Sequence, residues 1–169
     1  MCGISGYIGN KEFFPNKKKI DSCLNLMKKR GPDSQKKKIF LFKKLNSLFC
    51  ASRLSIIDTK DRSNQPLEDE KGILCFNGEI YNYIEIKKDL LKQKVKFKTT
   101  SDTEVLLKYL NFYGIEKIGN LHGMRSFVYF SKVKNKIYIC RDRFGEKPIF
   151  FSLNKKKKFL LFGSNVNYI

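Results

Sequence analysis

The chain opens Met1-Cys2-Gly3-Ile4-Ser5-Gly6-Tyr7-Ile8, an apolar run that follows directly on a cysteine at position two. Gly3 to Ile8 has the pattern of a β-strand. Removal of the initiator methionine would make Cys2 the N-terminal residue, with a thiol and an α-amine on the same residue. Since an α-amine has a reference pKa of about 7.7 to 8.0, part of it is unprotonated near neutral pH and can accept the thiol proton. The opening stretch therefore predicts a strand that carries an N-terminal nucleophile.

Four further motifs extend this interpretation across the chain. They are Arg30 to Asp33, Ala51 to Asp58, Phe76 to Tyr83 and Ser101 to Val105. Together with Cys2, they resemble the glutaminase domain of class II glutamine amidotransferases, and most closely the branch found in glutamine-hydrolysing asparagine synthetases. The resemblance extends from Cys2 to about Ser164. It implies an α+β fold of the N-terminal-nucleophile hydrolase type, a four-layer αββα sandwich of two antiparallel sheets flanked by helices.

The resemblance also implies a catalytic role for three residues. Cys2 would attack the side-chain amide of glutamine and form a thioester, while the Asn77 side chain and the Gly78 backbone N–H would form the oxyanion hole. Asn-Gly between apolar residues is also a strong hairpin signal, so a simple turn is the alternative for Asn77 and Gly78.

Three charged residues are expected to bind the amino-acid end of the substrate. Arg53 matches the family residue that binds the α-carboxylate, a role that suits a guanidinium. Asp102 matches the residue that accepts the α-amino group, and Glu79 is expected beside it. Alternatively, Asp102 only occupies the first turn of a helix, where the helix dipole favours acidic side chains.

Two other motifs are expected to be scaffold and not catalytic: Arg30 to Asp33, in which Asp33 would order the site, and Arg141 to Gly145. The sequence departs from the family at Arg125, which would place a charge near the core or the ammonia exit, and at Asn165, where the family has Glu. These departures put coupling to a synthetase in doubt.

Composition favours one folded domain over residues 1–169. Hydrophobic residues make up 41% of the chain, including 15 Phe and 8 Tyr, which argues against disorder. There is no secretory h-region and no apolar run of the roughly 20 residues that span a bilayer. We therefore expect a soluble, cytoplasmic protein.

Cysteine and histidine usage indicates neither a disulfide framework nor a metal site. The five cysteines are odd in number and lack a Cys-x-x-Cys pair, and those other than Cys2 lie in apolar segments that predict small core residues. His122 is the only histidine, and its sequence context, Asn-Leu-His-Gly-Met, predicts a turn and not a catalytic base.

The net charge of +19 raises the question of nucleic-acid binding. Only 6 of the 35 basic residues are Arg, and the lysines occur in scattered short runs. Arg is the residue favoured for phosphate and base recognition. We therefore expect weak non-specific electrostatic attraction and no specific nucleic-acid partner.

Strands and helices can be placed from the same patterns. Strands are predicted at Gly3 to Ile8, Ile39 to Leu45, Ala51 to Ile57, Ile73 to Phe76, Ser126 to Ser131, Lys136 to Arg141, Pro148 to Ser152 and Phe159 to Gly163. Helices are predicted from Asp21 to before Gly31, from a capping box of Asn82 and Glu85 to about Lys92, and from a capping box of Ser101 and Glu104 to Gly114. The absence of strand-helix alternation argues for antiparallel sheets.

The implied activity is hydrolysis of L-glutamine to glutamate and ammonia, with no metal or organic cofactor for that step. In the family, ammonia passes to an ATP-dependent synthetase domain that amidates aspartate and uses ATP and magnesium. Its pyrophosphate-binding motif is absent from this chain, so the partner would be a missing domain or a separate subunit. The alternatives are a catalytically idle or partner-dependent module of the same fold, or another class II branch. A homodimer is possible in either case.

Overall fold

Two antiparallel sheets stack face to face in the computed structural model, which describes residues 2–169. The first sheet has the strand order β2-β3-β1-β9-β8, and the second has the order β4-β5-β6-β7. The strands of the first sheet are β1 (Gly3–Gly9), β2 (Ser34–Phe42), β3 (Leu45–Arg53), β8 (Phe150–Asn154) and β9 (Phe159–Gly163). The strands of the second sheet are β4 (Leu67–Glu68), β5 (Gly72–Gly78), β6 (Arg125–Ser131) and β7 (Lys136–Arg141).

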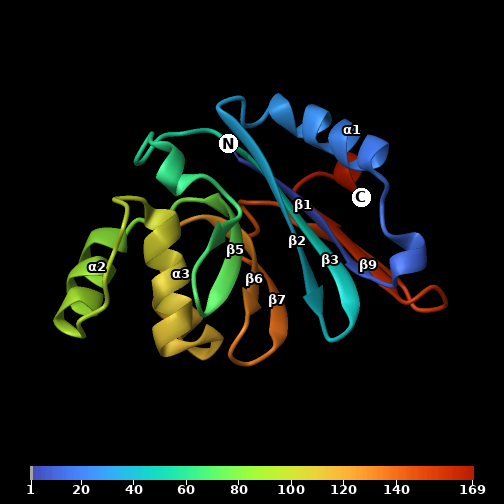
Figure 1. The fold of residues 1–169 in the computed structure, drawn as a ribbon. Helices are drawn as coiled ribbons and strands as arrows, with labels where there is room; N and C mark the ends of the chain where they lie inside the picture. The colour runs from blue at the N-terminus through green and yellow to red at the C-terminus, as the bar shows by residue number, and fades with distance from the viewer. Residues whose placement is uncertain (1) are drawn as a thin grey trace.

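Helices cover the outer faces of both sheets (Figure 1). Helix α1 (Lys17–Lys28) lies across the first sheet, while α2 (Tyr83–Lys92) and α3 (Asp102–Tyr113) lie on the outer side of the second. Short 3₁₀ helices occur at η1 (Lys11–Phe13), η2 (Asp61–Ser63), η3 (Ile115–Asn120) and η4 (Val166–Tyr168). The result is the predicted four-layer αββα sandwich.

The central strand β1 shows how the sequence pattern separates the layers. Its Ile4 and Ile8 pack between the two sheets, and Tyr7 packs on the opposite face against α1, because successive side chains of a strand alternate. A Cβ atom at Gly6 would lie 2.2 Å from the ring of Phe162. Glycine therefore lets the Phe162 ring of β9 lie against the central strand.

Most predicted strands are present, and their errors lie at the ends. Lys136–Arg141 and Phe159–Gly163 match the prediction to the residue. The predicted strand Ala51 to Ile57 is wrong, because β3 spans Leu45–Arg53 and the chain leaves the sheet after Arg53. The predicted strand Ile39 to Leu45 is also displaced, because β2 ends at Phe42 in a turn of two positive-φ lysines.

The helices begin where different side chains cap them. Asn16, not the predicted Asp21, caps α1, and its side chain accepts from the N–H of Lys19 at 3.0 Å. Asn82 precedes α2, but its side chain forms no cap and bonds the segment around His122 instead. Ser101 caps α3 as predicted, accepting from the N–H of Glu104. Within residues 2–169, no helix combines the length and hydrophobicity that crossing a bilayer requires.

Candidate active site

A cavity of about 90 Å³ lies where strand ends of both sheets meet the start of α3. Cys2 directly precedes β1, Arg53 ends β3, and Asn77 and Gly78 end β5. Asp102 is the first residue of α3. These five residues and Glu79 all line the cavity, so the fold brings the six predicted site residues together from four separate segments.

Cys2 is held by the strand that follows it. The N–H of Ile4 donates to Ser164 Oγ at 3.0 Å, and the N–H of Ser164 donates to the Ile4 carbonyl at 2.8 Å. Arg30 Nη1 in turn donates to the Ser164 carbonyl at 3.3 Å. Desolvation by burial raises the pKa of the Cys2 thiol, while the nearby charge of Arg53 acts in the opposite direction. Cys2 therefore lies in the cavity as a thiol that needs a base to become a nucleophile.

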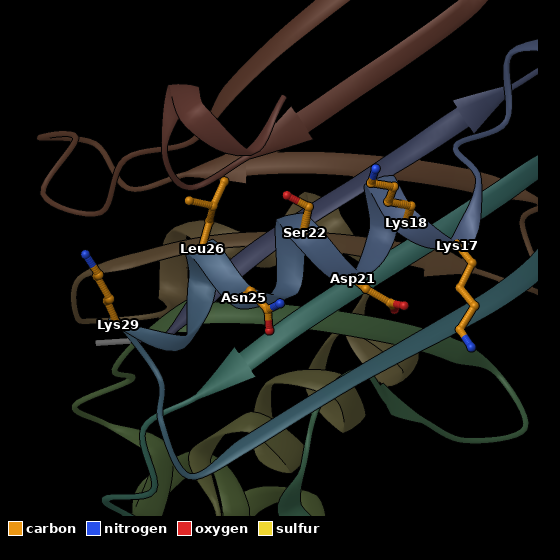
Figure 2. A pocket seen from close by; sticks show the side chains of 7 residues that line it. All are labelled: Lys17, Lys18, Asp21, Ser22, Asn25, Leu26 and Lys29. Atoms are coloured by element: carbon orange, nitrogen blue, oxygen red, sulfur yellow. The ribbon is translucent and has the colours of Figure 1, made fainter.

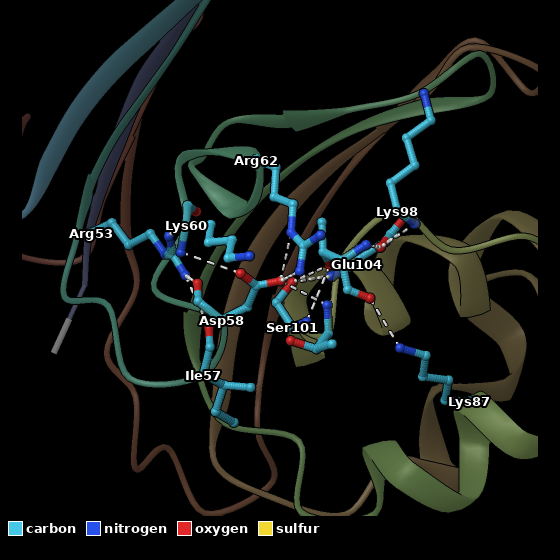
Figure 3. Close-up of polar contacts among 11 residues, drawn as sticks. Arg53, Ile57, Asp58, Lys60, Arg62, Lys87, Lys98, Ser101 and Glu104 are labelled. Atoms are coloured by element: carbon cyan, nitrogen blue, oxygen red, sulfur yellow. Dashed lines mark hydrogen bonds and ion pairs between the residues drawn. The ribbon is translucent and has the colours of Figure 1, made fainter.

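Arg53 is buried, with 4% of its surface exposed, and its guanidinium is held by the loop that follows it. Nη1 donates to the Lys60 carbonyl and to Asn64 Oδ1, each at 3.2 Å. Nη2 donates to the carbonyls of Ile57, at 3.0 Å, and Asp58 (Figure 3). None of the ion pairs among residues 2–169 involves Arg53, so its charge is hydrogen-bonded but not neutralised by a carboxylate.

Asn77 has a buried side chain without hydrogen-bond partners, and Gly78 has a backbone conformation and surroundings that exclude a side chain. Asn77 is 1% exposed, yet neither its side-chain oxygen nor its side-chain nitrogen has a hydrogen-bond partner. An unpaired buried amide is costly and points to a partner that binds there. Gly78 has φ +156°, and a Cβ at this position would lie 2.2 Å from the Met124 carbonyl oxygen. Only glycine fits this strand end next to the cavity.

Asp102 provides a buried carboxylate in the cavity lining. Its Oδ2 accepts from the N–H of Ile80 at 3.1 Å. Desolvation raises the pKa of Asp102 to about 6, the bond from Ile80 offsets part of this shift, and the nearby charge of Glu79 adds to it. The site therefore combines a thiol, an unpaired amide, the Arg53 guanidinium and two carboxylates around a small cavity.

Comparison with known proteins assigns this arrangement to a family. The sequence profile of the glutamine amidotransferase domain matches residues 1–169. The chain belongs to the glutamine amidotransferase domain family.

The relatives and the fold agree with this assignment. Glutamine-hydrolyzing asparagine synthetase 1 of Bacillus subtilis (strain 168) is 38% identical over 158 residues, which cover 90% of this chain and 24% of that protein. Glutamine-hydrolyzing asparagine synthetase 3 of the same organism is 30% identical over 174 residues, covering 100% of this chain and 27% of that protein. The amidotransferase domain thus spans about a quarter of the length of these curated relatives. Glutamine phosphoribosylpyrophosphate amidotransferase from B. subtilis has the same fold, with a TM-score of 0.70 at 16% identity over 99% of this chain and 42% of that chain.

Two motifs outside the cavity hold the amidotransferase site in place. Asp33 accepts from the N–H of Ser55 at 2.7 Å and donates its own N–H to the Arg53 carbonyl, so it orders the chain around Arg53 as expected. Asp142 accepts from the backbone N–H groups of Arg125, Phe144, Glu146 and Lys147, at 2.9 to 3.2 Å. Burial raises the pKa of Asp142, but these bonds outweigh burial and bring the pKa below its usual value.

The two departures from the family lie outside the cavity lining. Arg125 Nη1 donates to the carbonyls of Leu121 and Gly123, and Nη2 donates to that of Ile118. The guanidinium thus holds the segment before β6. Asn165 caps η4 by accepting from the N–H of Asn167 at 2.9 Å.

The remaining cysteines and His122 stand apart from the site. Cys50 and Cys75 are buried as predicted, whereas Cys23 and Cys140 are only half-buried, and none of the described cysteines forms a disulfide. His122 is exposed in the irregular segment before β6. Within residues 2–169, no three His, Cys, Asp or Glu side chains group as metal ligands would.

A larger hollow of about 760 Å³ runs along α1 (Figure 2). Its side chains all come from this helix and its end, and they point in different directions instead of converging on one point. The small cavity, and not this hollow, contains the converging polar groups expected of an active site.

Sequence reasoning missed three polar residues of the cavity lining. Gln65 is 3% exposed, and its Oε1 accepts from the N–H of Phe76 at 2.6 Å, next to Asn77. Thr103 and Lys147 also line the cavity. Gln65 and Lys147 each precede a proline in irregular segments, so no periodic pattern marked them.

Proposed function

We propose that this domain hydrolyses the side-chain amide of L-glutamine to give glutamate and ammonia. The observation that carries the proposal is Asn77, whose buried amide lacks any partner and lines the same cavity as the Cys2 thiol. A tetrahedral oxyanion formed at Cys2 would supply the missing acceptor.

Removal of Met1 prepares the nucleophile. The α-amine of Cys2 then takes the thiol proton, which is necessary because burial keeps the thiol pKa high. Sulfur attacks the amide carbon, and the Asn77 amide N–H and the Gly78 backbone N–H stabilise the oxyanion. The amine returns its proton to the departing ammonia, and water hydrolyses the thioester to release glutamate.

Charge complementarity selects an amino acid as substrate. Arg53, which has no carboxylate partner within residues 2–169, binds the α-carboxylate. Asp102 and Glu79, which line the same cavity, bind the α-ammonium. An amide that lacks either charged group would lose one of these contacts.

The names of the relatives support a proposal for the ammonia acceptor. Both B. subtilis proteins are named glutamine-hydrolyzing asparagine synthetases, and this chain matches only about a quarter of each. We infer that ammonia passes to an ATP-dependent synthetase domain or subunit that amidates aspartate. ATP and magnesium would be used there and not at Cys2.

Ammonia release from L-glutamine by the purified full chain tests the proposal. Intact mass first establishes that Met1 has been removed. Cys2→Ala is expected to abolish release, whereas Cys140→Ala, a cysteine outside the cavity, is expected to retain it. Folded, processed protein that releases no ammonia would favour the alternative of an idle or partner-dependent module.

A further inference from the structure

Asp58 holds together the two halves of the cavity without lining it. It follows β3 in the loop that surrounds Arg53, and its side chain is 1% exposed. Its Oδ2 accepts from the Thr100 N–H at 2.8 Å and from Arg62 Nε at 3.1 Å, and Oδ1 accepts from the Lys60 N–H at 3.3 Å (Figure 3). An ion pair to Arg62 Nη2 at 3.0 Å completes the set.

The contacts of Asp58 connect two segments that carry predicted substrate-binding residues. The carbonyl of Asp58 accepts from the Arg53 guanidinium, and its carboxylate binds Thr100, two residues before Asp102. Arg53 ends a strand of the first sheet, and Asp102 begins the helix that covers the second. Asp58 therefore binds the Arg53 guanidinium through its backbone carbonyl, and it binds the segment that carries Asp102 through its carboxylate.

The carboxylate is held firmly in its ionised form. Burial raises the pKa of Asp58, but the bonds from Thr100, Arg62 and Lys60 outweigh burial and bring the pKa well below its usual value. Asp58 also has φ +53°, a left-handed conformation that Asp and Asn tolerate better than other non-glycine residues. Both features indicate a residue fixed by its surroundings.

We propose that Asp58 is a positioning residue that sets the spacing between Arg53 and Asp102. The inference rests on the proposed function, in which these two groups bind the α-carboxylate and the α-ammonium of one amino acid. Both substrate charges are attached to a single Cα, so their separation is nearly fixed. A site that binds both must therefore keep its own charged groups at a matching distance.

Asp58→Asn is the variant that tests this role. Asparagine keeps the size and tolerates the positive φ, but it carries no charge and has one acceptor oxygen instead of two. It therefore loses the ion pair to Arg62 and cannot keep the bonds from Thr100 and Arg62 together with the bond from Lys60. The ligands are L-glutamine, glutaramate, which lacks the α-amine, and 4-aminobutanamide, which lacks the α-carboxylate. Kd values are measured by calorimetry in a Cys2→Ala background, so that no ligand is consumed.

A spacing role predicts a selective loss. Asp58→Asn should raise the Kd for L-glutamine about tenfold, equivalent to about 1.4 kcal/mol of binding free energy, because only this ligand uses both Arg53 and Asp102. The Kd values for glutaramate and 4-aminobutanamide should rise less than about threefold, because each ligand uses only one of the two residues. A purely structural role would weaken all three ligands equally, and that result, or no change, would overturn the proposal.

Two further variants complete the design. Asp21→Asn removes a carboxylate on the surface of α1 whose one ion pair within residues 2–169 is with Lys37, and it should change no Kd. If Asp58→Asn does not fold, Arg62→Gln replaces it, because this change removes the ion pair and the Nε bond to Asp58 but leaves the bonds from Thr100 and Lys60. The Kd for L-glutamine should then rise about two- to threefold more than the Kd values of the two analogues, and an equal change for all three ligands contradicts the inference. Ammonia release by the unmodified chain separates the proposed glutaminase activity from the spacing role of Asp58. If no Cys2-dependent ammonia is released, the proposed function is wrong. If ammonia is released but Asp58→Asn raises the Kd of all three ligands equally, only the spacing role is wrong.

Discussion

The Asp102 carboxylate accepts a hydrogen bond from the Ile80 backbone N–H, with oxygen and nitrogen 3.1 Å apart. This bond does not offset the burial of the carboxylate, so the pKa remains raised to about 6. Because only ionised Asp102 can bind an ammonium group, kcat/KM for glutamine should fall as pH drops through about 6. A rate profile between about pH 4.5 and 8 measures this, and Asp102→Asn should lose that inflection. A wild-type profile that stays flat through this range would contradict the assignment.

Asp102→Asn should also stabilise the fold at neutral pH. The folded-state pKa lies above the ordinary aspartate value of 3.8, so the folded state binds this proton more tightly than the unfolded state. Ionisation of Asp102 therefore lowers stability as pH rises from about 4 through 6 and above. Asparagine can still accept from Ile80 and removes the buried charge, for an expected gain of about 1 to 2 kcal/mol at pH 7. Urea unfolding at pH 7 checks the sign, and a less stable variant would show that the charge has a compensating partner.

Asn77→Leu separates catalysis from stability. The loss of an oxyanion donor should lower kcat by about 10² to 10³. The free energy of unfolding should stay level or increase, because leucine of similar shape replaces an unpaired buried amide. Steady-state kinetics and urea unfolding measure the two quantities. Ser47→Ala, which removes a buried unpaired hydroxyl outside the cavity lining, is the control and should leave kcat unchanged.

Gly78→Ala should destabilise the domain by about 2 to 4 kcal/mol. The added Cβ would lie 2.2 Å from the Met124 carbonyl oxygen, which belongs to the backbone and cannot rotate away. Gly119→Ala is the matched control, because a Cβ there has no atom within 4 Å. Equal unfolding midpoints for the two variants would mean that the strand end at Gly78 can shift.

Asp142→Asn should cost about 2 to 3 kcal/mol at pH 7, because the carboxylate accepts from four backbone N–H groups. The pKa of Asp142 is lowered on folding, so this stabilisation is present above the unfolded pKa of about 4 and is lost as pH falls through the folded pKa. The stability difference between wild type and variant should therefore shrink in acid. Urea unfolding of wild type and variant at pH 7 and at an acidic pH measures this stability difference. A difference that does not change with pH would rule out the ionised carboxylate as its cause.

The four layers and the cavity residues were predicted through the family resemblance that five separated motifs carry, whereas the apolar pattern alone indicated only antiparallel sheets with helices. Apolar runs bounded by polar residues or glycine located Lys136–Arg141 and Phe159–Gly163 to the residue. The interpretation failed after Arg53, where Ile56 and Ile57 continue an apolar run but leave the sheet. The Ile57 carbonyl there bonds the Arg53 guanidinium, and Ile56 is 73% exposed. The hydrogen bonds that the loop makes to the Arg53 guanidinium therefore override the strand propensity of Ile56 and Ile57.

Contacts between distant segments account for the other omissions. Asn82 has the sequence of a helix cap, yet its amide donates to the Asn120 carbonyl and accepts from the N–H of His122. Asp58 has no periodic signal, and its link to Thr100 spans 42 residues. Such bonds depend on tertiary proximity, which single-sequence patterns do not encode.

The pairing of β1 with β9 also orders events during synthesis. The bond between the Ile4 N–H and Ser164 Oγ joins residues 160 positions apart, so the seat of Cys2 is complete only after nearly the whole sequence described here has been made. Contacts of such long range form late in folding. Until then β1 stays unpaired on its β9 side. The first sheet therefore cannot close around the segment that follows Cys2 before β9 has been made.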